Sequence, residues 1–350
     1  MSLIRADLDT LPAYVPGRTV PGAIKLASNE VALPPAAAVL DAIAAAAHGG
    51  NRYPDLAAVS LTERLAHFCG VDAERIAVGC GSVSLCQQLV NSTCRETTDE
   101  VVFAWRSFEA YPIVTQIGGA VQRTVPLDGE FRHDLDAMAA AVGPNTRLVF
   151  VCSPNNPTGP AVTDAEFRRF LAAVGPDVVV ALDEAYFEFV TDPDAVNGRT
   201  LIDEHPNLVV LRTFSKAYRL AGFRVGYALG APPVIEALRK VCAPFSVSVP
   251  AQAAAIASID HSAELMADLA PIVEERTRVR EGLLAAGFTV PVTQSNFVWL
   301  ALGDAAAPFA AHCMDHKVVV RPFAGDGVRV TVSHSEENDA FLAAARAFAG

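Results

Sequence analysis

Apolar runs of strand length recur along the first two-thirds of the chain, with polar turns and helix-like segments between them. Thr163 and Glu166 stand three positions apart before an amphipathic run, a spacing that predicts a helix opened by a capping box. The alternation of strands with helices predicts a mainly parallel sheet covered on both faces, in a large three-layer α/β/α domain over 45–243. We predict its strands at about 76–78, 100–104, 121–125, 147–152, 177–182, 208–212 and 224–229.

The pattern changes after residue 243. Pro244 and Pro250 bracket a short loop, and a long alanine-rich helical stretch follows it. A further helix is predicted over 272–287, where charged residues pair four positions apart. These elements predict a smaller α+β domain over 244–350. Its strands are predicted at about 296–301, 318–320 and 328–332.

Length, charge and cysteine content limit the classes of protein to consider. At 350 residues the chain is longer than a single hydrophobic core usually accommodates, which agrees with two domains. The net charge of -12 disfavours nucleic acid as a partner, because phosphate backbones attract a basic surface. No apolar run reaches the roughly 18 residues of a membrane span, and residues 1–7 carry charges, so we expect a cytoplasmic protein that enters no membrane. The seven cysteines lack metal-binding spacing, so we expect no metal site.

Two of the predicted strands end in polar side chains. Asn156 lies in the turn S-P-N-N-P-T-G over 153–159, and Asp183 begins D-E-A-Y over 183–186. The carboxyl ends of strands are where open α/β sheets bind ligands. An aspartate facing a pyridine nitrogen would keep that nitrogen protonated, and the hydroxyl of Tyr186 could donate to a phenolate oxygen on the same ring. The alternative is that these residues only form turns and caps.

The most informative segment contains a lysine with hydroxyl side chains before it and an arginine after it. Lys216 follows Thr213 and Ser215, and Arg224 comes eight residues later. A lysine can form a Schiff base with an aldehyde, while the hydroxyls and the guanidinium can hold a phosphate, and pyridoxal 5'-phosphate (PLP) carries both groups. The glycine turn at 79–84 separates a strand from a helix and so predicts an anion site.

These motifs together resemble those of the fold-type-I, aspartate-aminotransferase-like PLP enzymes. S-P-N-N-P-T-G, D-E-A-Y and S-K-A-x-x-x-A-G-x-R-x-G occur in the same order, and the resemblance runs from Leu11 nearly to the C-terminus. It is strongest to the histidinol-phosphate and aromatic aminotransferase branch. The 79–84 turn and the run at 103–111 are most similar to actinobacterial aromatic (phenylalanine) aminotransferases.

The resemblance implies PLP as cofactor and assigns residues to its parts. Lys216 would be the Schiff-base lysine and proton shuttle, and Asp183 would pair with the pyridinium. Asn156 and Tyr186 would bind the phenolate oxygen, and Phe108 would stack on the ring. The residues implied for the phosphate are Gly81, Ser82, Val83, Thr213, Ser215 and Arg224, with Tyr53 reaching it from the other subunit of a homodimer.

The resemblance also implies substrate contacts and the position of the N-terminal segment. Arg329 would fork onto the α-carboxylate, because its two parallel N–H donors match two carboxylate oxygens. Asn29 is expected at the site, although 31–35 departs from the branch by lacking its usual asparagine, proline and glycine. Residues 1–44 would form an N-terminal arm and part of the small domain.

The implied reaction is transamination between an aromatic L-amino acid (phenylalanine, tyrosine or tryptophan) and 2-oxoglutarate by a ping-pong mechanism. Trp105, Phe108 and Tyr111 could supply aromatic surface, or Trp105 and Tyr111 could only pack a helix onto the core. Histidinol-phosphate aminotransferase and a phosphothreonine-type decarboxylase remain alternatives. Their substrates carry a dianionic phosphate, for which Tyr14 and Arg321 could supply a phenol and a cation.

Overall fold

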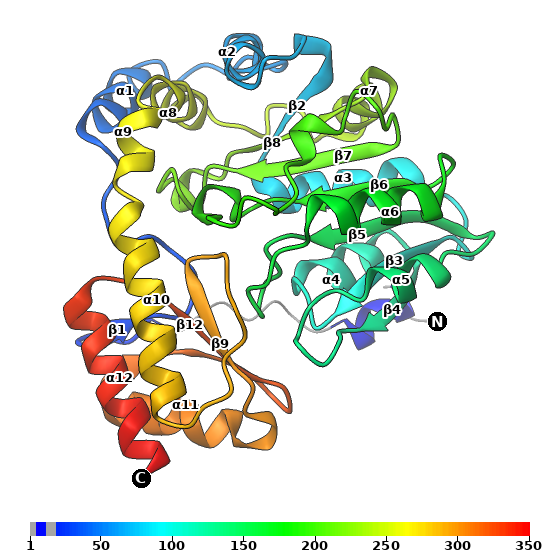
Figure 1. The fold of residues 1–350 in the computed structure, drawn as a ribbon. Coiled ribbons are helices and arrows are strands. Elements are labelled where there is room, and N and C mark those ends of the chain that lie inside the picture. The colour runs from blue at the N-terminus through cyan, green and yellow to red at the C-terminus, as the bar shows by residue number, and fades with distance from the viewer. Residues whose placement is uncertain (1–4, 12–18) are drawn as a thin grey trace.

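The computed structural model describes residues 5–11 and 19–350, and it is built around a seven-stranded sheet (Figure 1). The strand order is β2-β8-β7-β6-β5-β3-β4. Strand β8 runs antiparallel to its neighbours β2 and β7, and the remaining pairs are parallel. The predicted mainly parallel sheet is therefore confirmed. The strands are β2 Ile76–Gly79, β3 Glu100–Trp105, β4 Val121–Pro126, β5 Thr146–Cys152, β6 Val179–Asp183, β7 Leu208–Thr213 and β8 Gly226–Gly230.

Side chains alternate between two apolar layers, one on each face of this sheet. On β5, Val149 and Val151 belong to one core cluster, whereas Leu148 and Phe150 belong to the other. Helices α2, α5, α6 and α8 contribute to the first cluster, and α3, α4 and α7 to the second. Burial on both faces explains why these strands read as continuous apolar runs. We call the sheet and these helices the large unit.

Helices occur along the whole of the described chain. Their bounds are α1 Ala37–Ala47, α2 Val59–Cys69, α3 Gly81–Thr93, α4 Ala110–Ile117, α5 Leu135–Ala140, α6 Asp164–Val174, α7 Pro232–Val241, α8 Val249–Asp260, α9 Ser262–Ala267, α10 Ala270–Ala285, α11 Ala306–Asp315 and α12 Ser335–Ala349. The predicted capping box opens α6: the Thr163 hydroxyl accepts from the Glu166 N–H, and the Glu166 carboxylate accepts from the Thr163 N–H.

The small unit is a three-stranded antiparallel sheet packed against α10, α11 and α12. Its order is β11-β12-β9, with β9 Phe297–Leu300, β11 Arg321–Phe323 and β12 Gly327–Thr331. A separate parallel pair joins β1 Ile24–Lys25, from near the N-terminus, to β10 Val318–Val319. The sequence pattern did not predict β1 and β11, because two or three residues are too few to show a period. The domain boundaries at 44 and 243 remain predictions.

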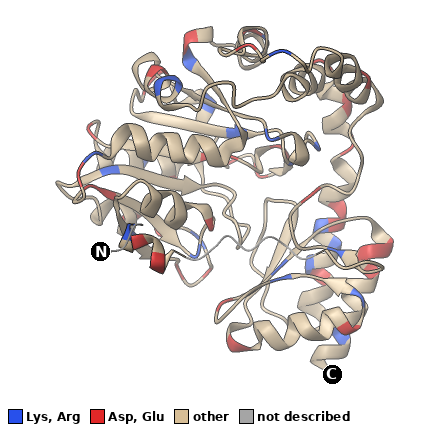
Figure 2. Cartoon of the chain, turned by 180° about the vertical axis from the view of Figure 1, so that it is seen from behind, with Lys and Arg blue, Asp and Glu red and all other residues tan. Residues whose placement is uncertain are grey.

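A short segment before β9 joins the two units. The Gln294 side-chain oxygen accepts from the Thr191 N–H at 2.8 Å, and the Gln294 N–H donates to the Gly159 carbonyl at 2.9 Å. Arg276 of α10 donates to the carbonyls of Phe189 and Ser295. These contacts hold β9 and β12 against the turn that carries Asn156. Figure 2 shows acidic and basic positions interspersed along both units, and within 5–11 and 19–350 no helix has the length and apolarity of a membrane span.

Candidate active site

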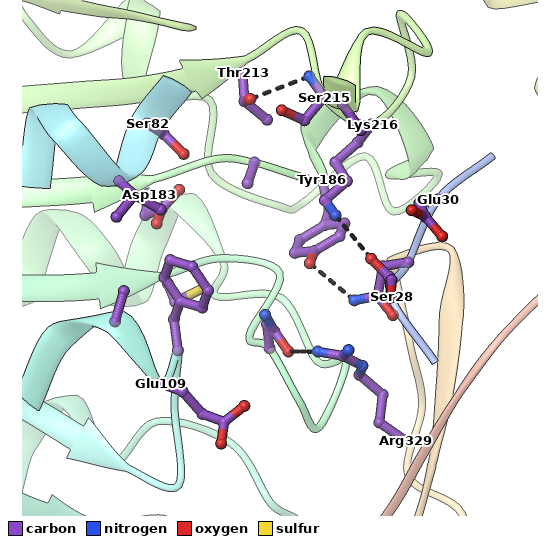
Figure 3. Close-up of a pocket in the computed structure, with 18 of the residues that line it drawn as sticks. Ser28, Glu30, Ser82, Glu109, Asp183, Tyr186, Thr213, Ser215, Lys216 and Arg329 are labelled. Atoms are coloured by element: carbon purple, nitrogen blue, oxygen red, sulfur yellow. Dashed lines mark hydrogen bonds between the residues drawn. The ribbon is translucent and has the colours of Figure 1, made fainter. Parts of the chain in front are cut away.

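A cavity of about 500 Å³ lies where the carboxyl ends of the parallel strands face the small unit (Figure 3). Its walls come from the ends of β5, β6 and β7, the start of α3, the segment after β1, and strands β11 and β12. Parallel strands end at the same edge of a sheet, so residues far apart in the sequence meet here. The predicted residues that line it are Asn29, Ser82, Val83, Phe108, Asn156, Asp183, Tyr186, Thr213, Ser215, Lys216, Arg224, Arg321 and Arg329.

Asp183 ends β6 as a buried carboxylate with one oxygen satisfied. Its Oδ2 accepts a hydrogen bond from the Tyr111 hydroxyl at 2.9 Å, whereas Oδ1 has no hydrogen-bond partner among the described residues. Burial raises the pKa of Asp183 to about 6. A buried acceptor without a donor is costly, so this oxygen suits an N–H group that enters the cavity.

Lys216 reaches the same cavity from the loop after β7. Its ammonium group donates to the Ser28 carbonyl at 3.2 Å. Burial lowers the pKa of Lys216 to about 7, and the positive charge of Arg329 contributes in the same direction. A substantial fraction of this side chain is thus the neutral amine near pH 7, which is the form that attacks a carbonyl carbon.

The start of α3 and the loop after β7 bring together groups that could bind an anion, and we call them the anion site. Arg224 donates to the Ser215 hydroxyl at 3.2 Å, and the Thr213 hydroxyl accepts from the Ser215 N–H at 3.1 Å. Gly81 has φ +73°, and a Cβ there would meet a guanidinium nitrogen of Arg224 at 2.4 Å. Glycine is therefore required for the arginine to lie against the helix N-terminus, where the exposed N–H groups favour a phosphate.

A hydrogen-bonded network forms the wall on the side of the small unit. Arg329 donates to the Asn156 side-chain oxygen at 2.6 Å and to the Ala27 carbonyl at 2.8 Å. Asn29, which is 1% exposed, donates to the Tyr186 hydroxyl at 2.9 Å. The departure at 31–35 therefore does not remove Asn29 from the cavity. Burial raises the pKa of Tyr186 well above its usual value, which keeps this hydroxyl a donor.

Of the three residues that the sequence offered as aromatic surface, Trp105, Phe108 and Tyr111, only Phe108 lines the cavity. Tyr111 is fully buried and stacks on Phe150 with ring centroids 4.5 Å apart. Trp105 packs beside Phe103 and beneath the guanidinium of Arg106. These two residues therefore pack the core, the alternative that the sequence had left open. The bond from Tyr111 to Asp183 had no sequence signal, since it joins residues 72 positions apart.

One predicted residue of the described chain, Tyr53, lies away from the cavity. Tyr53 is 83% exposed, stacks on Phe245 with centroids 4.7 Å apart, and does not line the cavity of its own chain. Tyr14 lies outside the described residues. Arg321 lines the cavity as expected, but it is paired with Glu109 at 3.0 Å, a residue that the sequence analysis had not singled out.

The cavity fits PLP in three separate respects. Lys216 offers an amine to its aldehyde, Asp183 Oδ1 offers an acceptor to its ring N–H, and the cradle around Gly81 offers donors to its phosphate. Fold and site together define a fold-type-I PLP-dependent enzyme. The family model "Aminotransferase class I and II" matches residues 21–345, and the chain belongs to this family.

Curated relatives and solved structures agree with this assignment. An "Aromatic amino acid aminotransferase" of Rhodococcus opacus (strain B4) is 57% identical over 97% of this chain and 94% of that protein. A protein of the same name from Streptomyces coelicolor is 52% identical over 99% and 97%. The histidinol-phosphate aminotransferase of Sinorhizobium meliloti, solved with PLP, is 30% identical, with a TM-score of 0.91 over 100% of this chain and 98% of that one. The resemblance seen in the sequence is confirmed, and the protein is a PLP-dependent aminotransferase.

Proposed function

We propose that this aminotransferase moves the amino group of an aromatic L-amino acid, with phenylalanine preferred, to 2-oxoglutarate in a ping-pong cycle. The observation that carries the proposal is the similarity, over nearly the whole chain, to relatives named aromatic amino acid aminotransferases at 52–58% identity. The cavity supports it with an apolar side and with an arginine suited to a carboxylate.

Lys216 is the proposed proton carrier. When bound, PLP supplies an aldehyde that takes up the amino group and a ring that withdraws electrons from Cα. The Lys216 amine would hold that aldehyde and then carry the proton between Cα of the substrate and C4' of the cofactor. Its pKa of about 7 suits both roles, since the group can accept and release a proton near neutral pH.

Asp183 and Tyr186 would orient and polarise the ring. The Tyr111 hydroxyl fixes one oxygen of Asp183, which leaves the other in place to accept the ring N–H. A carboxylate there keeps the ring nitrogen protonated, and this strengthens the withdrawal of electrons. Tyr186 and Asn156 would bind the phenolate oxygen, with Tyr186 held by Asn29.

Both substrates would use Arg329. Each carries an α-carboxylate, and the guanidinium can bind two carboxylate oxygens in parallel. Phe108, Ala110 and Ile113 form the apolar side of the same cavity. A phenyl ring buried against them gains roughly 1.5–3 kcal/mol, enough to prefer an aromatic over a small aliphatic side chain about tenfold or more.

We also propose a homodimer. Tyr53 lies away from the cavity of its own chain, so it can serve a phosphate site only by reaching the cavity of a second subunit.

The experiment compares kcat/KM for L-phenylalanine and histidinol phosphate, each with 2-oxoglutarate as acceptor. Phenylalanine should be the better donor, and initial rates at several fixed acceptor concentrations should give the parallel double-reciprocal lines of a ping-pong cycle. Histidinol phosphate has no carboxylate and would forgo Arg329, so it should be the poorer donor. The Lys216→Ala variant is the control and should have no transaminase activity without added amines. A preference of about a hundredfold or more for histidinol phosphate would instead favour the role named for the Sinorhizobium structure.

A further inference from the structure

An ion pair between the two units forms part of the cavity wall. Glu109 precedes α4 in the large unit, and Arg321 lies on β11 in the small unit. The Arg321 guanidinium donates to both carboxylate oxygens of Glu109, at 3.0 and 3.3 Å, and both residues line the cavity. In Figure 3, Glu109 lies across the cavity from Thr213 and Ser215 of the anion site. The pair therefore stands on the side left for the substrate.

Arg321 is the cation that remains for a second anionic group on the substrate. The basic residues that line the cavity in the described chain are Lys216, Arg224, Arg321 and Arg329. In the proposed function, three of them already have a partner: Lys216 holds the aldehyde of the cofactor, Arg224 its phosphate, and Arg329 the α-carboxylate of the substrate. Arg321 is 13% exposed and already carries the carboxylate of Glu109. A side chain that brings a phosphate would therefore meet a pair of net charge zero.

A second ion pair joins the same two units. Arg106, in the loop after β3, pairs with Asp326, in the turn between β11 and β12. Arg106 also lies over the rings of Trp105 and Phe323. Neither Arg106 nor Asp326 lines the cavity. The Arg106–Asp326 pair thus joins the two units away from the cavity, whereas the Arg321–Glu109 pair joins them at the cavity wall.

We propose that Glu109 is a specificity-determining residue that favours an amino donor with an uncharged aromatic side chain over an amino donor that carries a phosphate. A dianion at Arg321 would either lie next to the Glu109 carboxylate or displace it, and both arrangements leave that partly buried carboxylate close to two further negative charges. An aromatic ring leaves the pair intact and pays no such cost. This selection against one class of ligand acts through repulsion as well as through fit. That an aromatic donor is the favoured one rests on the proposed function.

The test measures half-reactions of the holoenzyme, in which a donor converts the bound cofactor to its aminated form with no 2-oxoglutarate present. The quantity compared is the ratio of kcat/KM for histidinol phosphate to that for L-phenylalanine. Glu109→Gln should raise this ratio about tenfold or more, because Arg321 is then free to bind the phosphate. Asp326→Asn breaks the pair away from the cavity and should leave the ratio within about twofold of the unsubstituted enzyme. The Glu109→Gln/Arg321→Gln double variant should lose the gain.

Three results would overturn the inference. They are an unchanged ratio in Glu109→Gln, an equal rise in Asp326→Asn, and a gain that persists without Arg321. Cofactor absorbance and thermal midpoint, recorded for every variant, separate a change of specificity from a loss of folding. Failure of the proposed function appears separately, as a preference for histidinol phosphate in the unsubstituted enzyme, because the inference concerns only the change in the ratio.

Discussion

At the scale of single residues, the site holds charged groups in states that they avoid in water. Asp183 is buried with one oxygen bonded to Tyr111 and the other facing the cavity. Its raised pKa means that the folded chain without cofactor binds a proton more tightly than the unfolded chain does. Lys216 shows the opposite shift, since burial favours its neutral form. In the cofactor-free protein, the ionised form of each group lowers the stability of the fold, because it is buried without a charged partner. Binding of the cofactor would supply that partner.

The first prediction concerns Asp183→Asn in the cofactor-free protein. The usual aspartate pKa of 3.8 and the folded value of about 6 differ by the equivalent of about 3 kcal/mol. Because the folded value is the higher one, the free energy of unfolding falls as pH rises through this window. The loss is complete above about pH 7. Asparagine keeps the bond from Tyr111 and carries no charge. The variant should therefore have the higher thermal midpoint at pH 7.5, and the difference should vanish near pH 4.

The same comparison with PLP added supplies the control. The cofactor should raise the thermal midpoint of the unsubstituted protein more than that of Asp183→Asn, because only the carboxylate gains a charged partner. Equal midpoints of the two cofactor-free proteins at pH 7.5 would contradict the burial of an ionised Asp183.

At the scale of elements, the proposed phosphate site consists of a strand, a glycine turn and a helix held against a neighbouring strand. Strand β2 leads through Cys80 into α3, whose first residue, Gly81, lies against Arg224. Gly226 at the start of β8 approaches the same turn, where a Cβ would meet the Ser82 nitrogen at 2.9 Å. This close packing of backbone on backbone places the guanidinium of Arg224 beside the helix N-terminus, and both groups favour a phosphate nearby.

The second prediction is that Gly81→Ala weakens PLP binding about tenfold or more, measured by titration of cofactor absorbance. The added methyl group must displace Arg224 from the anion site. Gly119→Ala is the matched control, because Gly119 has a similar φ of +78° but nothing within 4 Å of its Cβ position. Both variants bear a backbone strain of about 1 kcal/mol, so cofactor affinities that fall equally in the two would argue against a steric role for Gly81.

At the scale of the whole molecule, an apolar surface beside α1, α2 and α8 accompanies the exposed Tyr53. Leu56 is 63% exposed, Val59 47% and Phe245 41%, and Tyr53 stacks on Phe245. Grouped apolar side chains on a surface favour contact with another chain. A second copy of this chain would cover them and bring Tyr53 to a neighbouring site, which is the arrangement expected of the proposed homodimer.

The third prediction is that the protein sediments as a dimer and that Tyr53 acts across its interface. Tyr53→Phe removes one phosphate donor and should lower PLP affinity several-fold while the dimer persists. Mixing unfolded Lys216→Ala and Tyr53→Ala chains and refolding them together should restore activity, because one site of each hybrid dimer receives both residues. A stable monomer with full activity would refute the homodimer and the role of Tyr53 together.

The sequence by itself determined the strands of the large unit, the capped start of α6 and the residues at the strand ends. These features are local: an apolar run of a given length, a capping box and a glycine turn have the same meaning wherever they occur. Lys216 and Asp183 could be placed at one edge because each follows a parallel strand. Asn156 could be placed there as well, because its turn follows a predicted strand, whereas the position of Arg329 came from the family resemblance.

Only the tertiary structure decided which side chains meet across the cavity. Tyr111 with Asp183, Asn29 with Tyr186, and Glu109 with Arg321 join residues 72, 157 and 212 positions apart. No period or spacing encodes such pairs, because they exist only after elements distant in the sequence have packed against one another. The same physical reason explains why β1 escaped the sequence pattern: its two residues are held by pairing with the distant strand β10, and not by an apolar run of their own.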